Sequence, residues 1–320
     1  MYRTFVRSFV LGVPLLGAAI PTLVHASCGS AFCTLNTAWE TQGVPSDPGL
    51  RLDLRAEYID QDQPRAGRRD VAVGEIPHHH DEQRTLNRNL IANLDYAPNQ
   101  DWGVAVQLPL VDRDHRHIHN HRGAQLPEAW NFQEVGDLRV LGRRRLASGD
   151  TTHGVTAGLK LPTGKKDVKN EDGDIAERPL QPGTGTTDVI LGYYANTTRL
   201  VRDTPMRWFF QTQVQAPVAE SENFRSGVHY SADIGLGYPA AARWSALLQV
   251  NASIKGRDRG TEAEPADSGG SFVHLSPGVN YAPGKSTAFY GFVQLPVYQR
   301  VNGVQLTADW GATIGMSMRF

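Results

Sequence analysis

The sequence predicts an all-β protein: a transmembrane, antiparallel, up-and-down β-barrel of about twelve strands with short periplasmic turns and longer outer loops. Three observations support this fold class. Apolar and polar residues alternate from residue 50 to the end, and the alternating segments are mostly about ten residues long. The connections between these segments are alternately short and long. Hydrophobic residues make up 40% of the 320 residues and charged residues 20%, which is too polar for a helical membrane protein.

Residues 1–26 have the pattern of a signal peptide. Arg3 and Arg7 precede an apolar run that ends at Val24, and the small residue Ala26 stands at the expected cleavage point. No later stretch reaches the run of about 18 apolar residues that a transmembrane helix requires. We therefore expect an exported protein that no helix holds in a membrane.

The following stretch, residues 27–49, is predicted to be an N-terminal periplasmic segment ahead of the barrel, and a plug inside the lumen is the alternative placement. It contains the two cysteines of the sequence, Cys28 and Cys33. In an oxidising compartment, a close pair of this kind favours a small disulfide loop. A metal-binding or redox pair is the alternative interpretation.

The barrel itself is predicted to span residues 50–320. The expected strands are residues 50–59, 87–96, 102–111, 136–146, 153–162, 186–197, 206–218, 228–238, 243–255, 271–281, 287–298 and 306–320. Every second connection is short, whereas several of the others are long and charged. This alternation is typical of outer-membrane barrels, and it places both termini on the periplasmic side.

The last of these strands shows the alternation most clearly. Trp310, Ile314 and Phe320 share one parity with other apolar residues, while the intervening residues are small or polar. Successive side chains of a strand point to opposite faces, so we expect an apolar face against outer-membrane lipid. The terminal aromatic residue is also typical of a strand that the barrel-assembly machinery recognises. A soluble, secreted β-protein with one buried face is the alternative.

The opposite parity carries charges, which predicts a polar lumen. Four consecutive inward charges on the first strand cannot lie in a dry apolar core without partners, and a twelve-stranded barrel is intermediate between a filled interior and an open channel. These side chains either line a permeation path or hold the barrel together as mutual ion pairs. The predicted lumen residues are Arg51, Asp53, Arg55, Glu57, Asp95, Asp137, Arg139, Lys160, Asp188, Asp233 and Asp309.

Three short motifs resemble an outer-membrane family named for MetA-pathway phenol degradation and grouped with FadL-like transporters. They are Gly158 to Gly164, Leu180 to Gly185 ahead of Asp188, and the closing residues Gly315 to Phe320. The resemblance extends over residues 50–320 and implies an outer-membrane barrel that takes up small organic compounds. It implies no role for the cysteines or the histidines.

Seven of the eleven histidines fall in two predicted outer loops. Alternate residues of an extended segment share one face, and neighbouring imidazoles can bind zinc, copper or nickel. A pH-responsive gate and a loop that is either hydrated or internally hydrogen-bonded and folded into the lumen are the other interpretations. The candidate ligands are His78, His79, His80, His115, His117, His119 and His121.

The favoured function is a passive, porin-like channel for a small solute in the outer membrane of a Gram-negative cell. The alternative is a non-conducting barrel whose histidine-rich loops bind a transition-metal ion such as zinc or copper. The formal net charge is -1, so the sequence lacks the excess of basic residues that is typical of nucleic-acid-binding proteins. His229 and Ser231 resemble part of a barrel phospholipase site, but Ser231 has the inward parity and no oriented base accompanies it, so no enzyme is expected.

Overall fold

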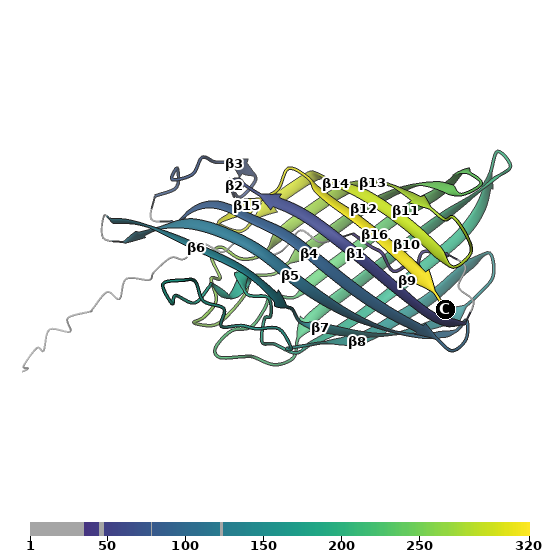
Figure 1. Cartoon of the computed structure of the whole chain (residues 1–320), viewed down its shortest axis with the longest axis horizontal. Coiled ribbons are helices and arrows are strands. Elements are labelled where there is room, and N and C mark those ends of the chain that lie inside the picture. Colours follow the sequence, from purple (N-terminus) through teal and green to yellow (C-terminus); the bar gives the residue numbers. More distant parts are fainter. Residues whose placement is uncertain (1–34, 45–47, 78, 122–123) are drawn as a thin grey trace, which may run out of the picture.

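The computed structural model describes residues 35–44, 48–77, 79–121 and 124–320, and for His121 it describes the backbone alone. These residues form a closed barrel of twelve antiparallel strands (Figure 1), which confirms the predicted fold class. No helix in these ranges is long and apolar enough to cross a membrane.

Most wall strands pair with their neighbours along the chain, so the topology is up-and-down. With β6 and β7 counted as one interrupted strand, the wall in the described part of the chain consists of β1 (Gly49–Gln61), β4 (Asp81–Ala97), β5 (Trp102–His121), β6 (Ala124–Val135), β7 (Leu138–Ala147), β8 (Thr151–Leu161), β9 (Asp188–Val201), β10 (Thr204–Pro217), β11 (His229–Ala241), β12 (Trp244–Lys255), β13 (Gly270–Tyr281), β14 (Thr287–Val301) and β16 (Gly311–Arg319). A second, small sheet contains β15 (Val304–Thr307), β2 (Gln63–Ala66) and β3 (Arg69–Asp70), and a short 3-10 helix, η1, spans Arg178–Leu180.

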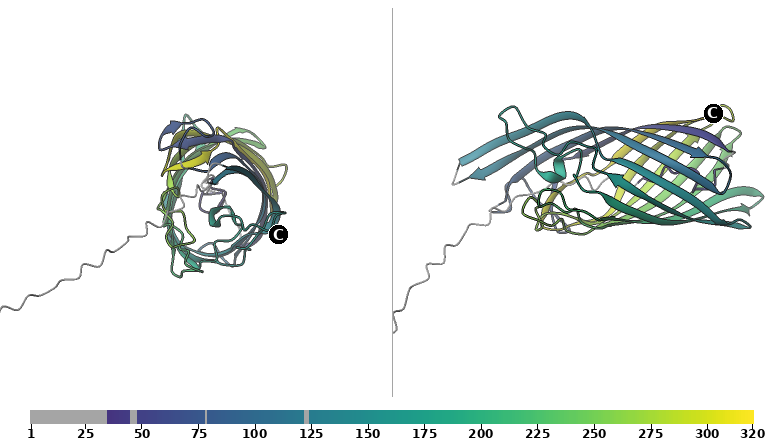
Figure 2. Two further views of the ribbon diagram at one scale, coloured as in Figure 1. Left: turned by 90° about the vertical axis from the view of Figure 1, so that its left-hand side faces the viewer. Right: turned by 90° about the horizontal axis from the view of Figure 1, so that it is seen from below.

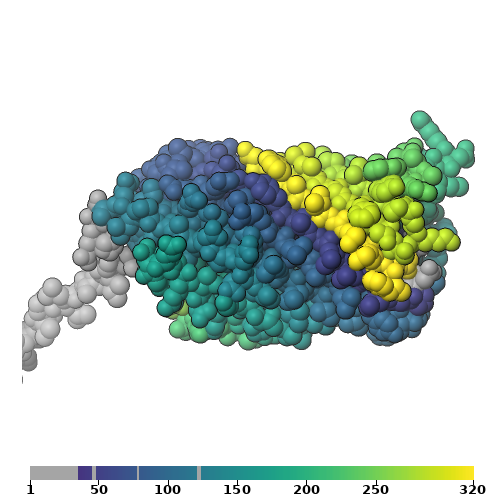
Figure 3. Space-filling model, in the orientation of Figure 1, coloured from purple at the N-terminus to yellow at the C-terminus, as the bar shows by residue number. Residues whose placement is uncertain are grey.

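The first and last wall strands close the barrel. β16 pairs with β14 on one side and with β1 on the other, and the yellow C-terminal strand lies against the purple first strand in Figure 3. Phe320 extends this ladder, because its N–H donates to the carbonyl oxygen of Leu50 at 2.9 Å. The C-terminal strand is therefore part of the closed wall.

The two ends of the barrel differ in their connections. At the end marked C in Figure 1, turns of two to five residues join the wall strands, and we call this the short-turn end. At the opposite, long-loop end, the connections include residues 62–80, 162–187 and 256–269. The predicted alternation of short and long connections is confirmed except after the third predicted strand, where the expected long loop is replaced by paired strand: β5 ends at His121 and β6 begins at Ala124. The short-turn end is the one that the sequence predicts to face the periplasm.

Two strands extend six residues or more beyond their predicted bounds at the long-loop end. β4 starts at Asp81, and β5 continues past residue 111 to His121. The extension of β5 pairs with β6, a segment predicted to be loop. Outward side chains are charged there, and Arg88 contacts Asp112 at 2.7 Å. The extension therefore stands outside the apolar belt of the wall.

Burial in the wall is inverted relative to that of a soluble β-protein. On β1, Asp53 and Glu57 are only 2% and 4% exposed, whereas Ile314 on β16 is 67% exposed and Phe320 is 75% exposed. The charged parity thus turns into the barrel and the apolar parity turns outward. This is the arrangement of a membrane barrel with a polar interior.

Four inward aromatic rings lie over glycines of the neighbouring strand. In each case the two residues are paired directly, and a Cβ on the glycine would fall 2.2–2.3 Å from a ring atom. The glycine leaves room for the ring against the inner wall. The pairs are Gly154–Tyr194, Gly235–Phe209, Gly278–Phe292 and Gly315–Tyr290.

Replacing Gly278 with Val is expected to destabilise the barrel by about 1–3 kcal/mol, the usual range for an overpacked interior. The new Cβ would lie 2.3 Å from the Phe292 ring and 2.7 Å from the carbonyl oxygen of Gly291, so the ring and the strand must shift. Urea unfolding in detergent micelles, followed by tryptophan fluorescence, measures the loss. Gly284→Val is the control, because a Cβ there meets nothing within 4 Å. Equal losses in the two variants would contradict the packing argument.

Candidate functional site

Most of the predicted lumen residues lie on the inner side of the wall. Asp309 does not, because the last predicted strand is divided: β15 ends at Thr307, β16 begins at Gly311, and Asp309 lies in an exposed bend between them. Its predicted position on a wall strand is corrected accordingly, and a role of the other ten in permeation stays a prediction. These ten are Arg51, Asp53, Arg55, Glu57, Asp95, Asp137, Arg139, Lys160, Asp188 and Asp233.

Residues 35–44, which we call the N-terminal segment, lie inside the barrel. Trp39 is 6% exposed, and its ring meets that of Tyr290 edge-on with the ring centres 4.8 Å apart. The indole Nε1–H also donates to Asp53 Oδ2 at 3.0 Å. The indole is therefore held by the inner wall on both its apolar and its polar side.

Asn36 fixes the same segment to the opposite part of the wall. Its backbone N–H donates to Gln249 Oε1 at 3.3 Å, and its side-chain amide donates to Gln211 Oε1 at 2.7 Å and to Asp233 Oδ2 at 3.3 Å. Gln249 in turn donates to the Asn36 carbonyl oxygen at 2.9 Å. The segment thus crosses the lumen between β1 and β10–β12.

Of the two alternative placements predicted for residues 27–49, the periplasmic one is corrected for the part that the structure describes. Residues 35–44 are inside the lumen because the polar inner wall supplies hydrogen-bond partners for them. Cys28 and Cys33 lie outside the described residues, as does the predicted signal peptide, residues 1–26. The disulfide loop and the signal peptide stay predictions.

A chain of opposite charges ties the N-terminal segment to the short-turn end. Glu40 lies 2.6 Å from Arg51 on β1 and 3.8 Å from Arg143 on β7. Arg143 in turn lies 3.1 Å from Asp95 on β4. The ion pairs therefore join the N-terminal segment directly to β1 and β7 and, through Arg143, to β4.

Lys160 is the centre of a second charge network. Its ammonium lies 3.0 Å from Asp137 and 3.3 Å from Asp188, and it is 5% exposed. Asp137 also accepts the backbone N–H groups of Gly164 and Thr184 at 3.1 and 2.9 Å. These contacts favour the interpretation that charges in this part of the lumen hold the barrel together.

A cavity of about 610 Å³, here called the vestibule, opens at the short-turn end between the N-terminal segment and the wall. Trp39 borders it on the inner side. The charged side chains among the described residues that line it are Arg51, Arg207, Lys285 and Arg319, and no Asp or Glu is among them.

At the long-loop end, the chain folds back into the barrel. The segment around η1 lies inside the barrel outline in the left view of Figure 2. Leu180 is 0% exposed and belongs to an apolar cluster with Trp130 and Leu306. Arg113 donates to the carbonyl oxygen of Leu180 at 2.6 Å, which fixes η1 to β5.

The predicted histidine loops are corrected by the structure, because one of them is a strand. Alternate side chains of a strand point the same way, so His115 and His117 both turn inward, and they are 0% and 1% exposed. Of the seven histidines in these two predicted loops, the structure describes His115, His117, His119 and the backbone of His121 on β5, and His79 and His80 ahead of β4, whereas His78 lies outside the described residues.

Hydrogen bonds from neighbouring strands orient the two buried imidazoles. Thr85 Oγ1 on β4 lies 2.8 Å from His115 Nδ1, and Glu128 Oε2 on β6 lies 3.1 Å from His117 Nε2. The inner nitrogens, His115 Nε2 and His117 Nδ1, are 3.0 Å apart. Glu82 Oε2 on β4 lies 3.8 Å from His115 Nε2.

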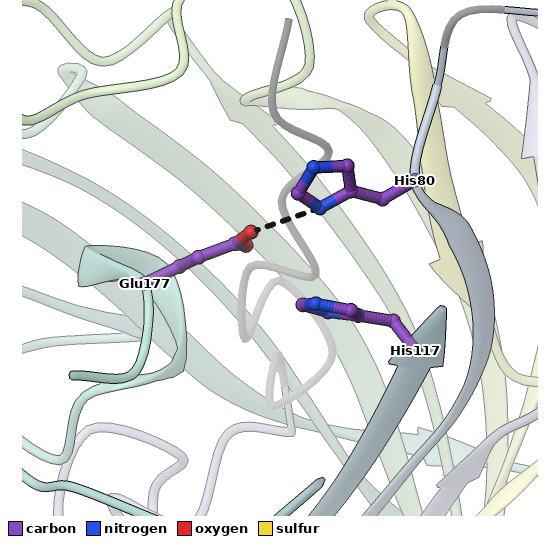
Figure 4. A group of neighbouring side chains, drawn as sticks. All are labelled: His80, His117 and Glu177. Carbon is purple, nitrogen blue, oxygen red and sulfur yellow. Dashed lines mark ion pairs between the residues drawn. The ribbon is translucent and has the colours of Figure 1, made fainter. Parts of the chain in front are cut away.

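Further acidic groups and His80 surround this pair. Figure 4 shows His80 and His117 on one side of a gap and Glu177 on the other, with His80 Nδ1 3.6 Å from Glu177 Oε1. Burial raises the pKa of Glu264 well above its usual value, and the carboxylates of Glu177 and Glu82 raise it further. Burial lowers the pKa of His80. The cluster is therefore rich in carboxylates, and at His80 the effect of burial, which favours the neutral imidazole, exceeds that of the nearby carboxylates, which favour the charged form.

Several residues of these sites have little signal in the sequence. Trp39 lies in a stretch without alternation, and Glu177 and Glu264 lie in long polar loops. The alternation within residues 124–135 is the signal that could have revealed β6, and with it Glu128.

No protein-family model matches the chain, and no curated protein is similar to it in sequence. Solved structures are similar to it in fold to different degrees, and the first of the following three is similar enough to share that fold. An outer-membrane channel from Pseudomonas putida F1 is 13% identical, with a TM-score of 0.63 over 87% of this chain and 98% of that chain. The NanC porin is 9% identical, with a TM-score of 0.47 over 84% of this chain and 100% of that chain. The Ralstonia pickettii toluene transporter TbuX is 11% identical, with a TM-score of 0.44 over 90% of this chain and 94% of that chain. The first likeness shows that this chain has the barrel fold of an outer-membrane channel, in agreement with the resemblance in its sequence.

Proposed function

We propose that the protein is a passive, porin-like channel in the outer membrane of a Gram-negative cell, that it admits small anionic solutes, and that the N-terminal segment restricts its lumen. The apolar outer face lies in outer-membrane lipid, and the C-terminal strand is the part that the barrel-assembly machinery recognises. The observation that carries this proposal is the vestibule, with basic but no acidic residues among the described side chains that line it.

The charges of the vestibule favour anions. Arg51 is neutralised by Glu40, which lies 2.6 Å away. Arg207 and Lys285, in contrast, make no ion pair with any described residue. A concave site lined by one sign of charge, between low-dielectric walls, concentrates ions of the opposite sign. The vestibule also falls within the range of about 300–1,000 Å³ that is typical of small-molecule sites.

Single-channel recordings in planar bilayers are expected to show discrete steps and, in a salt gradient, a reversal potential that favours anions. Arg207→Gln is expected to shift that potential towards zero by several millivolts, because it removes one of two positive charges without an ion partner. Arg144→Gln is the matched control, since its guanidinium lies over the outward-facing Trp102 ring at 4.4 Å.

Two results would contradict the proposal. One is a preference for cations in the wild-type chain. The other is electrical silence combined with the absence of anion uptake by liposomes that contain the protein.

A further inference from the structure

The ligand atoms of three buried side chains converge at the long-loop end of the barrel. Glu82, His115 and His117 each offer one atom, and these three atoms all lie within 4.8 Å of one another. The three side chains are 2%, 0% and 1% exposed. They are carried by β4 and β5, which are paired strands, so their backbones are held in a fixed relation.

The spacing of these atoms fits a small divalent ion. The separations are 3.0 Å between the two ring nitrogens and 3.8 Å from His115 Nε2 to Glu82 Oε2. Two ligands of a tetrahedral zinc ion, each about 2.1 Å from it, are about 3.4 Å apart. Shifts of a few tenths of an ångström therefore bring both pairs to that distance. Two imidazoles and one carboxylate form a ligand set that zinc commonly uses.

The outer nitrogen of each imidazole has the partner that a metal-bound histidine requires. A ligating histidine usually donates its other N–H to a carboxylate or another oxygen, which orients the ring. Glu128 Oε2 lies 3.1 Å from His117 Nε2 and Thr85 Oγ1 lies 2.8 Å from His115 Nδ1. With these two oxygens as acceptors, both inner nitrogens present lone pairs to the shared point.

The same contacts can also form a closed hydrogen-bond relay. In that state, the Thr85 hydroxyl donates to His115, His115 donates to His117, and His117 donates to Glu128. A hydroxyl can donate or accept. Rotation of the Thr85 hydroxyl and a tautomer change at His115 therefore convert the relay into the ligand arrangement with no net change in protonation.

A second observation points to a cation at this place. Glu264 Oε2 and Asp267 Oδ2 are buried and have no hydrogen-bond partner among the described residues, although the other oxygen of Asp267 lies 2.9 Å from His79 Nε2 and Glu264 shares a hydrogen bond with Glu177. Both belong to the loop that packs over the cluster, and Glu264 lies within interaction range of the Glu82 and Glu177 carboxylates. Without a cation, this cluster takes up a proton, as the raised pKa of Glu264 indicates; a divalent ion bound beside Glu82 would be stabilised by the same carboxyl groups.

We infer that Glu82, His115 and His117 form a binding site for one divalent transition-metal ion of the zinc class, enclosed at the long-loop end of the barrel. The site is separate from the vestibule and does not depend on conduction. His80 and Glu177 form a neighbouring group around the same His117, but His80 and Glu177 come from loops, and the oriented outer nitrogens favour the strand-borne set.

Calorimetric titration of the chelator-treated, folded barrel with Zn²⁺ alone is expected to give one ion per chain. Glu82→Gln, which keeps the side-chain shape, and His115→Ala are each expected to abolish this stoichiometric binding. Glu128→Gln is expected to weaken it by about 10–100-fold, the usual effect of removing the partner of a ligating histidine. Cu²⁺ bound at the site is expected to give an electron paramagnetic resonance spectrum with two coordinated nitrogens.

Two controls keep the test specific to this ligand set. His80→Ala and His153→Ala are expected to retain one Zn²⁺ per chain, because neither side chain belongs to the set, and barrel folding of every variant is checked by heat-modifiable migration in gels. Absence of Zn²⁺ binding by the wild type overturns the inference. Binding that survives both Glu82→Gln and His115→Ala, or that is lost with His80→Ala, also overturns it.

Discussion

Replacing residues 35–44 with a glycine-serine segment of the same length is expected to raise the single-channel conductance several-fold. The natural segment crosses the lumen, where Trp39 packs against Tyr290 and Asn36 bonds to Gln249. A glycine-serine chain offers neither the ring nor the amide, so it gains nothing that offsets the entropy lost on ordering in the lumen. Planar-bilayer recordings of both proteins measure the difference.

A single substitution gives a graded form of this experiment. Trp39→Ala removes the ring contacts and the hydrogen bond to Asp53, so excursions to the larger conductance are expected to become frequent. Trp244→Ala is the control, because Trp244 is 49% exposed and its ring lies 4.6 Å from that of Tyr281. Unchanged conductance after replacement of the whole segment would contradict its role as the restriction.

The barrel could be predicted because the outer face of a membrane strand imposes a period of two on the sequence. On β1, the prediction that Arg51, Asp53, Arg55 and Glu57 turn inward is confirmed by their burial. The same pattern predicts an end for β5 at residue 111, ten residues before its end in the structure. Beyond the apolar belt, the outward residues become charged, so the apolar signal stops while the hydrogen-bonded strand continues to His121.

The sites were less accessible to sequence reasoning because distant residues form them. The backbone of Asn36 bonds to Gln249, a residue 213 positions away, and no local pattern encodes such a contact. The histidines themselves could be singled out by their spacing, but a strand context was needed to show that His115 and His117 share a buried face. Glu128, the partner of His117, lies on a strand that was not predicted.

Replacing Lys160 with Met is expected to destabilise the barrel by about 3–5 kcal/mol, the usual result of removing one partner from a buried charge network. The ammonium lies 3.0 Å from Asp137 and 3.3 Å from Asp188, so its loss leaves two carboxylates close together without their shared cation. Urea unfolding of the barrel in micelles measures the change in the free energy of unfolding.

A second substitution separates this charge effect from the loss of packing. Lys160→Met combined with Asp188→Asn is expected to regain part of the stability, because the carboxylate that remains, Asp137, still accepts the backbone N–H of Thr184 at 2.9 Å. Lys285→Met is the control: Lys285 lies in an exposed turn, and its substitution is expected to change stability by no more than about 0.5 kcal/mol. If the double variant is no more stable than Lys160→Met alone, repulsion between the two carboxylates is not what Lys160 relieves, and its contribution lies in packing.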